Sequence, residues 1–165
     1  MTKLKLISKK AIPAAIKKAN HYRLLNEPGE AESICLDILL TEPNNQQALI
    51  ILVLALTDRF DKSYDIGDSV AEDILPRIRS KYNRAYYSGI MCERRAKAAL
   101  RQSSPGAKFA AHDWLQQAMD HYQDAEKLRP AGNDDAVLRW NTCARIIEHN
   151  HLTPHHAGEE ESQLE

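Results

Sequence analysis

The sequence has few of the residues that build disulfide frameworks, sheets or glycine-rich loops. Its three cysteines, Cys35, Cys92 and Cys143, are widely spaced and form no Cys-x-x-Cys pair. We therefore expect small buried thiols rather than disulfides or a metal site. Glycine is scarce, with six residues, and aromatic residues make up only 6% of the chain. Ala, Leu, Ile, Lys, Arg and Glu dominate instead, which favours helices over sheets.

Long apolar runs are also missing. The longest, residues 48–56, has nine residues, whereas a membrane-spanning helix needs about 20. The N-terminal lysines are not followed by an apolar stretch and a cleavage site, so no secretory signal is predicted. We therefore expect a cytoplasmic protein with no membrane partner.

Sequence motifs for catalysis are lacking as well. The chain contains no Gly-x-Ser-x-Gly, no phosphate-binding loop and no His-Glu-x-x-His. His149, His151, His155 and His156 surround the end of a predicted helix and a proline-containing tail, where incidental metal affinity is expected rather than a built site. The sequence thus predicts a protein that is not an enzyme, with no cofactor and no metal centre.

Stops of Pro, Gly, Asn and Ser divide the chain into seven segments with helical patterning. The predicted helices cover residues 8–25, 30–40, 46–56, 62–79, 83–102, 107–128 and 133–148. The third is apolar on nearly all sides and is expected in the interior. The pattern predicts an all-α domain over residues 1–151. Residues 152–165 contain His and Glu but few apolar residues, so we expect a disordered tail there.

Two segments repeat the same spacing of small, large and helix-stopping residues. In each, an alanine is followed by similar residues 4, 7 and 12 positions later. The first segment has Ala31, Cys35, Ile38 and Pro43. The second has Ala118, Tyr122, Ala125 and Pro130. This spacing resembles the second half of a tetratricopeptide repeat, a helix hairpin of about 34 residues. The resemblance covers about residues 10–150, although the tryptophan of the family's first conserved position is absent.

The resemblance implies an α-solenoid of three helix hairpins followed by a C-terminal capping helix. Pro43 and Pro130 are 87 residues apart, about 19 more than two repeats need. Most of the extra length falls after Gly89, which adds about two turns, or roughly 12 Å, to each helix of the third hairpin. We therefore expect an elongated third hairpin that projects beyond the others, with close helix packing at Gly89 and Ala118.

Members of this family usually bind an extended peptide or a partner helix in the concave groove lined by the first helix of each hairpin. By register, the resemblance implies a groove of apolar, amide, tyrosine and arginine side chains: Ile16, Asn20, Arg23, Ile50, Leu54, Asn83, Tyr86, Ile90, Arg94, Asn141 and Arg145. Tyrosine and arginine are favoured at binding centres. The alternative is that several of these residues are buried by neighbouring helices. The predicted function is an adaptor or assembly helper for a protein or peptide partner.

Charge is unevenly distributed although the net charge is −1. Residues 77–101 hold eight cations and Glu93 as their one acid. Four cations would form a basic surface on the long hairpin: Arg95, Lys97, Arg101 and Lys108. Such a surface could contact an acidic protein or nucleic-acid phosphates. A nucleic-acid-associated regulator is therefore the alternative function, although few aromatic residues are nearby for base stacking. A secretion-type chaperone of similar size is a third reading.

Two other charged stretches stand out. Residues 1–25 hold seven cations and no acid. Five acids recur at spacings of three and four, which places them on one helix face: Asp58, Asp61, Asp65, Asp68 and Glu72. The acidic series is interpreted as a solvated outer face, and its sequence lacks the pattern of a calcium-binding loop.

Overall fold

The protein is all-helical in the residues that its computed structural model describes, 2–60 and 66–155, with only the backbone described for 66–68. These residues form seven α-helices and two short 3₁₀ turns and no strand, which confirms the predicted all-α class. The helices are α1 (Ile12–Leu24), α2 (Pro28–Thr41), α3 (Gln46–Thr57), α4 (Ile66–Ile74), α5 (Lys81–Gln102), α6 (Ala107–Leu128) and α7 (Asp135–His149). Among these helices, none combines the length and the apolar character needed to cross a bilayer.

The helix ends differ from the predicted ends by a few residues, for local chemical reasons. The fifth helix begins before the expected Asn83 because the Ser80 side chain caps it, accepting a hydrogen bond of 3.1 Å from the Asn83 backbone N–H. Asn45 caps α3 in the same way through the Ala48 N–H at 3.0 Å. Where a helix was predicted over 62–79, the described part is α4 followed by a 3₁₀ turn over Leu75–Arg77.

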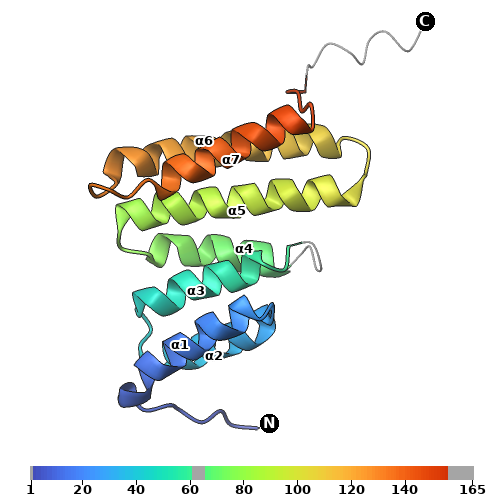
Figure 1. Ribbon diagram of the computed structural model, residues 1–165. Helices are drawn as coiled ribbons and strands as arrows, with labels where there is room; N and C mark the ends of the chain where they lie inside the picture. Colours follow the sequence, from blue (N-terminus) through green and yellow to red (C-terminus); the bar gives the residue numbers. More distant parts are fainter. Residues whose placement is uncertain (1, 61–65, 156–165) are drawn as a thin grey trace, which may run out of the picture.

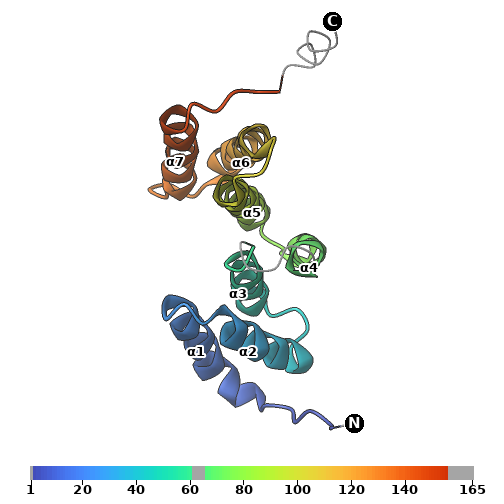
Figure 2. The ribbon, with the colours of Figure 1, turned by 90° about the vertical axis from the view of Figure 1, so that its right-hand side faces the viewer.

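Successive helices pack together from α1 to α4 and again from α5 to α7. The two groups are joined by the contact of α3 with α5, and α1 also contacts α3. Figure 1 shows the resulting stack, with α1 and α2 at one end and α6 and α7 at the other. In the view along the helices, α1 and α7 lie on the same side of α3 and α5, so the array curves around that side (Figure 2). The candidate site described below is assembled from α3, α5 and α7.

The fifth and sixth helices are much longer than those before them. Each has 22 residues, whereas α1, α2 and α3 have 13, 14 and 12. At 1.5 Å per residue, the long pair spans about 33 Å and the others about 20 Å. Their connected ends extend past α3 and α4 (Figure 1). The extra length expected of these two helices is therefore present.

The interior consists of two apolar clusters that meet at α5. The first gathers buried residues of α1 to α4, with α3 contributing from nearly every side as predicted. The second surrounds Tyr122 and Leu115 between α5, α6 and α7. The three cysteines are buried and form no disulfide, and burial raises the pKa of Cys35 and of Cys143 to about 12. At neutral pH these two side chains therefore remain protonated thiols.

Close helix packing at Gly89 and Ala118 is confirmed. A Cβ atom added at Gly89 would lie 2.5 Å from Cε1 of Tyr122, closer than real atoms approach. Ala118 is fully buried one turn before Tyr122. Glycine on α5 thus makes room for the tyrosine ring of α6, which brings the two long helices together.

The packed part of the chain extends beyond the predicted boundary at residue 151. Leu152 is only 6% exposed and belongs to the second cluster, and its N–H donates to the Ile147 carbonyl at 3.0 Å. The His155 ring lies edge-on to Phe109, with ring centres 5.0 Å apart. The boundary is corrected accordingly, because the turn after α7 folds Leu152 back onto the core. The rest of the predicted tail, 156–165, lies outside the described residues.

Replacing Gly89 by alanine should destabilise the fold because the new methyl group collides with Tyr122. We expect Gly89→Ala to lower the free energy of unfolding by about 1–3 kcal/mol, measured by urea denaturation. Gly29→Ala is the matched control, since its Cβ would have only Arg59 Nη1 nearby, at 3.9 Å. Equal stability of the two variants would contradict the close approach of α5 and α6.

Truncation of the tail should reveal where the packed region ends. A chain ending at His155 should unfold at the same temperature as the full chain, because it retains Leu152 and the His155–Phe109 contact. Leu152→Ala should cost about 2–5 kcal/mol, the usual range for a buried leucine. Thermal unfolding followed by circular dichroism measures both. If Leu152→Ala has no effect, the leucine does not pack as described.

Candidate functional site

A buried carboxylate, Glu93, joins the two long helices. Glu93 lies on α5 and is only 1% exposed. The Tyr122 hydroxyl on α6 donates a hydrogen bond to Glu93 Oε2 at 2.7 Å. Burial raises the pKa of Tyr122, and the neighbouring Glu93 charge raises it further, so the hydroxyl keeps its proton and remains a donor. One oxygen of the carboxylate is thereby satisfied within the protein.

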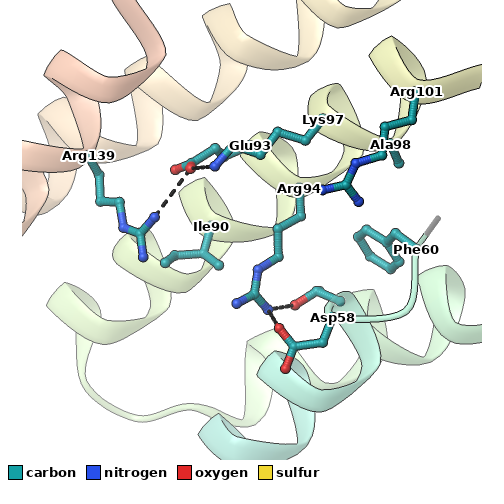
Figure 3. A pocket seen from close by; sticks show the side chains of 10 residues that line it. Asp58, Phe60, Ile90, Glu93, Arg94, Lys97, Ala98, Arg101 and Arg139 are labelled. Carbon is teal, nitrogen blue, oxygen red and sulfur yellow. Dashed lines mark hydrogen bonds and ion pairs between the residues drawn. The ribbon is translucent and has the colours of Figure 1, made fainter. Parts of the chain in front are cut away.

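The other oxygen of Glu93 is paired with two cations. Lys97 Nζ, one turn further along α5, lies 2.5 Å from Oε1, and Arg139 Nη1 of α7 lies 3.3 Å from it. Burial would lower the pKa of Arg139, but the Glu93 charge and the contact with Tyr86 raise it overall. Both cationic side chains remain over a third exposed. One carboxylate thus connects α5, α6 and α7 and holds two cations near the surface (Figure 3).

A second acid, Asp58, anchors cations at the end of α3. Arg94 Nη1 of α5 lies 2.9 Å from Asp58 Oδ1, and Arg23 Nε of α1 lies 2.9 Å from Oδ2. Arg94 also donates to the Leu54 carbonyl at 2.8 Å, near the C-terminal end of the helix, and shares this carbonyl with the Asp58 N–H, which lies 2.9 Å from it. Burial lowers the pKa of Arg94, and Asp58 opposes that shift. This cluster links α1, α3 and α5.

A pocket of about 230 Å³ opens between the two acidic anchors. Figure 3 shows its lining side chains, which come from the end of α3 and the residues after it, from α5 and from α7. Its charged lining comprises four cations and two carboxylates: Arg94, Lys97, Arg101, Arg139, Asp58 and Glu93. Phe60, Ile90 and Ala98 supply apolar surface. The excess of cations favours an anionic group of a ligand.

The structure distributes the predicted groove residues unequally. Arg94 and Ile90 line the pocket, and Arg23 reaches Asp58 beside it. Ile16 is buried in the first core cluster and offers nothing to a partner. Tyr86 is half-buried and stacks on Tyr82, with ring centres 5.9 Å apart. The others do not line the pocket: Ile50, Leu54, Asn83 and Asn141 are half-buried, and Asn20 and Arg145 are exposed.

The predicted basic surface of the long hairpin separates into different environments. Lys97 and Arg101 share one face of α5 with Arg94 and line the same pocket. Lys108 is exposed beyond the turn, beside a separate hollow at the tip of the hairpin. Two residues of the predicted groove, Ile90 and Arg94, therefore line the same pocket as two residues of the predicted basic surface.

Arg95 must be removed from the basic surface. It is buried, its guanidinium lies 4.6 Å from the centre of the Trp114 ring, and Nη2 is 2.7 Å from Glu72 Oε1. Because one residue turns a helix by about 100°, Arg95 points away from the face that carries Arg94. Of the acidic series, Asp58 is partly buried and ion-paired, whereas Glu72 is ion-paired but exposed, as expected for a solvated face. Of the same acidic series, Asp61 and Asp65 and the Asp68 side chain lie outside the described residues.

Glu93 is the functional residue that the sequence reasoning missed. It is the one acid among eight cations in residues 77–101, and Lys97 follows it at the i+4 position. That pattern marks a paired carboxylate, but it does not say that the pair is buried or that Tyr122 and Arg139 complete it. The charges of residues 77–101 therefore pointed to Glu93, whereas the tetratricopeptide-like spacing did not.

Comparisons with known proteins leave the site to be interpreted from its own residues. No protein-family model matches the chain, and no match was found among curated proteins or solved structures. In the part of the chain that the structure describes, no three His, Cys, Asp or Glu residues are grouped to hold a metal ion. What remains is a pocket whose chemistry is set by arginines, lysine and their two carboxylate partners.

Removing both cations that face Glu93 should leave an uncompensated buried charge. We expect Lys97→Met/Arg139→Met to lower the free energy of unfolding at pH 7 by about 3–5 kcal/mol.

Urea unfolding at pH 7 measures the loss. Adding Glu93→Gln to the double variant should restore most of the stability, because no charge is then buried. Lys108→Met/Lys127→Met, which removes two exposed lysines, is the matched control. A loss that is not rescued by Glu93→Gln would contradict the network.

Proposed function

We propose that the protein is a tetratricopeptide-like adaptor that binds an extended acidic segment of a partner protein along α5. In this proposal α1/α2, α3/α4 and α5/α6 are three stacked hairpins of an α-solenoid, and α7 is the terminal cap. The contacts of α1 with α3 and of α3 with α5 are those expected between the first helices of successive hairpins. The binding surface is the side toward which α1 and α7 project (Figure 2).

The repeated spacing of the sequence supports this arrangement. The six residues that match at offsets 0, 4 and 7 are all fully buried: Ala31, Cys35 and Ile38 on α2, and Ala118, Tyr122 and Ala125 on α6. Equivalent burial of equivalent positions is what repeated hairpins require, because each buries the same face against its neighbour. The second helices of the first and third hairpins thus share a packing pattern as well as a spacing.

The observation that carries the functional proposal is the cationic pocket. Along α5, five residues recur at spacings of three and four, which gives them one face of the helix: Tyr86, Ile90, Arg94, Lys97 and Arg101. A peptide lying on this face meets the half-buried Tyr86 first and then the cations around the pocket, because Ile90 is only 3% exposed. Carboxylates of the peptide would receive charge-assisted hydrogen bonds there. An acidic segment with one apolar or aromatic residue fits this order best.

The nucleic-acid alternative has less support. Arg95 is buried against Trp114, and Lys97 is engaged with Glu93, so two of the four expected phosphate contacts are committed within the protein. A concave pocket also suits a side chain better than a duplex backbone. A reducing cytoplasmic location is part of the proposal, since three buried cysteines that form no disulfide need no oxidising compartment.

Substitutions in the pocket should separate the acidic-peptide proposal from the alternative. Partners are first captured with the wild-type protein from extract of the source organism, with and without nuclease treatment. The binding segment of a captured protein is then prepared as a peptide. Arg101→Glu should weaken the peptide's affinity at least about tenfold, since a charge at a binding centre is reversed. Tyr86→Ala should weaken it by a similar factor. Isothermal titration calorimetry measures each dissociation constant.

Two exposed lysines provide matched controls. Lys127→Glu, on α6 and outside the pocket lining, should leave the affinity unchanged. Lys108→Glu tests the tip of the hairpin. If Lys108→Glu alone abolishes binding, or if the captured partner is a nucleic acid, the pocket is not the binding site and the alternative function takes its place.

A further inference from the structure

The N-terminal segment exposes two leucines to solvent. Residues 2–8 form no regular secondary structure, and Leu4 and Leu6 are 70% and 72% exposed. The segment is attached at Ile7, which packs against the first core cluster and accepts a hydrogen bond of 3.1 Å from the Thr41 hydroxyl. The leucines therefore lie just beyond an anchored point of the fold and contribute nothing to its core.

Exposed lysines lie before, between and after these leucines in the sequence. Six lie within the first 18 residues, and all are exposed: Lys3, Lys5, Lys9, Lys10, Lys17 and Lys18. No described ion pair involves any of the six, and residues 1–25 contain no acid. The pocket cations are different, because Asp58 and Glu93 partly neutralise them. The N-terminal charge is thus uncompensated within the described protein.

We infer that residues 2–18 dock on an anionic membrane surface. The six lysines would lie at the phosphate and carboxylate headgroups, and Leu4 and Leu6 would enter the boundary of the acyl chains. Anionic leaflets attract basic segments, and each lysine near the surface adds to the attraction. Buried leucines add a contribution that does not depend on charge. No described helix could span a bilayer, so the binding is peripheral.

A lipid surface explains this combination better than other anionic partners do. Nucleic-acid phosphates would pair with the lysines but offer nothing to the leucines. Recognition of single strands gains mainly from aromatic stacking, and the first aromatic residue of the chain is Tyr22. A bilayer presents anionic headgroups and an apolar interior within a few ångströms of each other. Alternating lysine and leucine at positions 3–6 match that arrangement.

The proposed membrane contact, residues 2–18, does not depend on the proposed adaptor function. In Figure 1 the N-terminal segment lies at the end of the stack formed by α1 and α2, whereas α5 and α7 lie toward the other end. A molecule held on a membrane through residues 2–18 would leave the pocket between α3, α5 and α7 open to a partner. No membrane partner was expected because the sequence has no apolar run long enough to span a bilayer, and peripheral binding does not need such a run.

Vesicle flotation with the full chain tests the inference. The protein should float with vesicles of phosphatidylcholine mixed with phosphatidylserine and remain behind with phosphatidylcholine alone. Raising the salt concentration should weaken binding, since it screens the lysines. Leu4→Ser/Leu6→Ser should lower the partition coefficient at least about tenfold. Lys3→Gln/Lys5→Gln/Lys9→Gln/Lys10→Gln should lower it by a similar factor.

The control variant is Leu128→Ser/Leu138→Ser, which changes two leucines that are also exposed but lie on α6 and α7. It should float like the wild type. All these positions are exposed, and circular dichroism confirms that each variant is folded. Absence of flotation with the mixed vesicles overturns the inference. So does equal flotation of the N-terminal leucine variant and the control, because binding would then owe nothing to Leu4 and Leu6.

Discussion

The burial of Glu93 is the constraint on which the C-terminal half of the structure depends. An ionised carboxylate that is 1% exposed is tolerated only when its oxygens are paired. Tyr122 satisfies one oxygen from α6, and Lys97 and Arg139 satisfy the other from α5 and α7. Gly89, one turn before Glu93, gives the Tyr122 ring the space to reach it. The register of three helices is therefore tied to one side chain.

The same pairing places charge at the surface. Lys97 and Arg139 are both paired with the buried Glu93, and over a third of each side chain is exposed. Asp58 holds Arg94 in a similar way at the end of α3. Cations that would otherwise move freely are thus fixed around one pocket, and fixed donors lose less entropy on binding an anion. The interactions that stabilise the fold also determine what the pocket can bind.

The outline of the fold could be predicted from the sequence because it depends on local signals. Helix stops at residues such as Pro43 and Pro130, together with apolar periodicity, located the helices to within a few residues. The spacing between those prolines predicted the length of α5 and α6. The site was only partly predictable. The sequence assigned Arg94 to the groove and Arg101 to the basic surface, and both line the pocket. No local signal could show that Arg95 is buried against Trp114 or that Leu152 folds back.

Those missed features arise from contacts between residues far apart in sequence. Glu93 meets Tyr122 and Arg139 across 29 and 46 positions, and pairs of this kind leave no mark on helical periodicity. A double-mutant cycle between Glu93→Gln and Tyr122→Phe tests the central claim most directly. Urea unfolding of the wild type, both single variants and the double variant should give a coupling energy of about 1 kcal/mol or more. Effects that add within about 0.5 kcal/mol would contradict a buried carboxylate that holds α5 and α6 together.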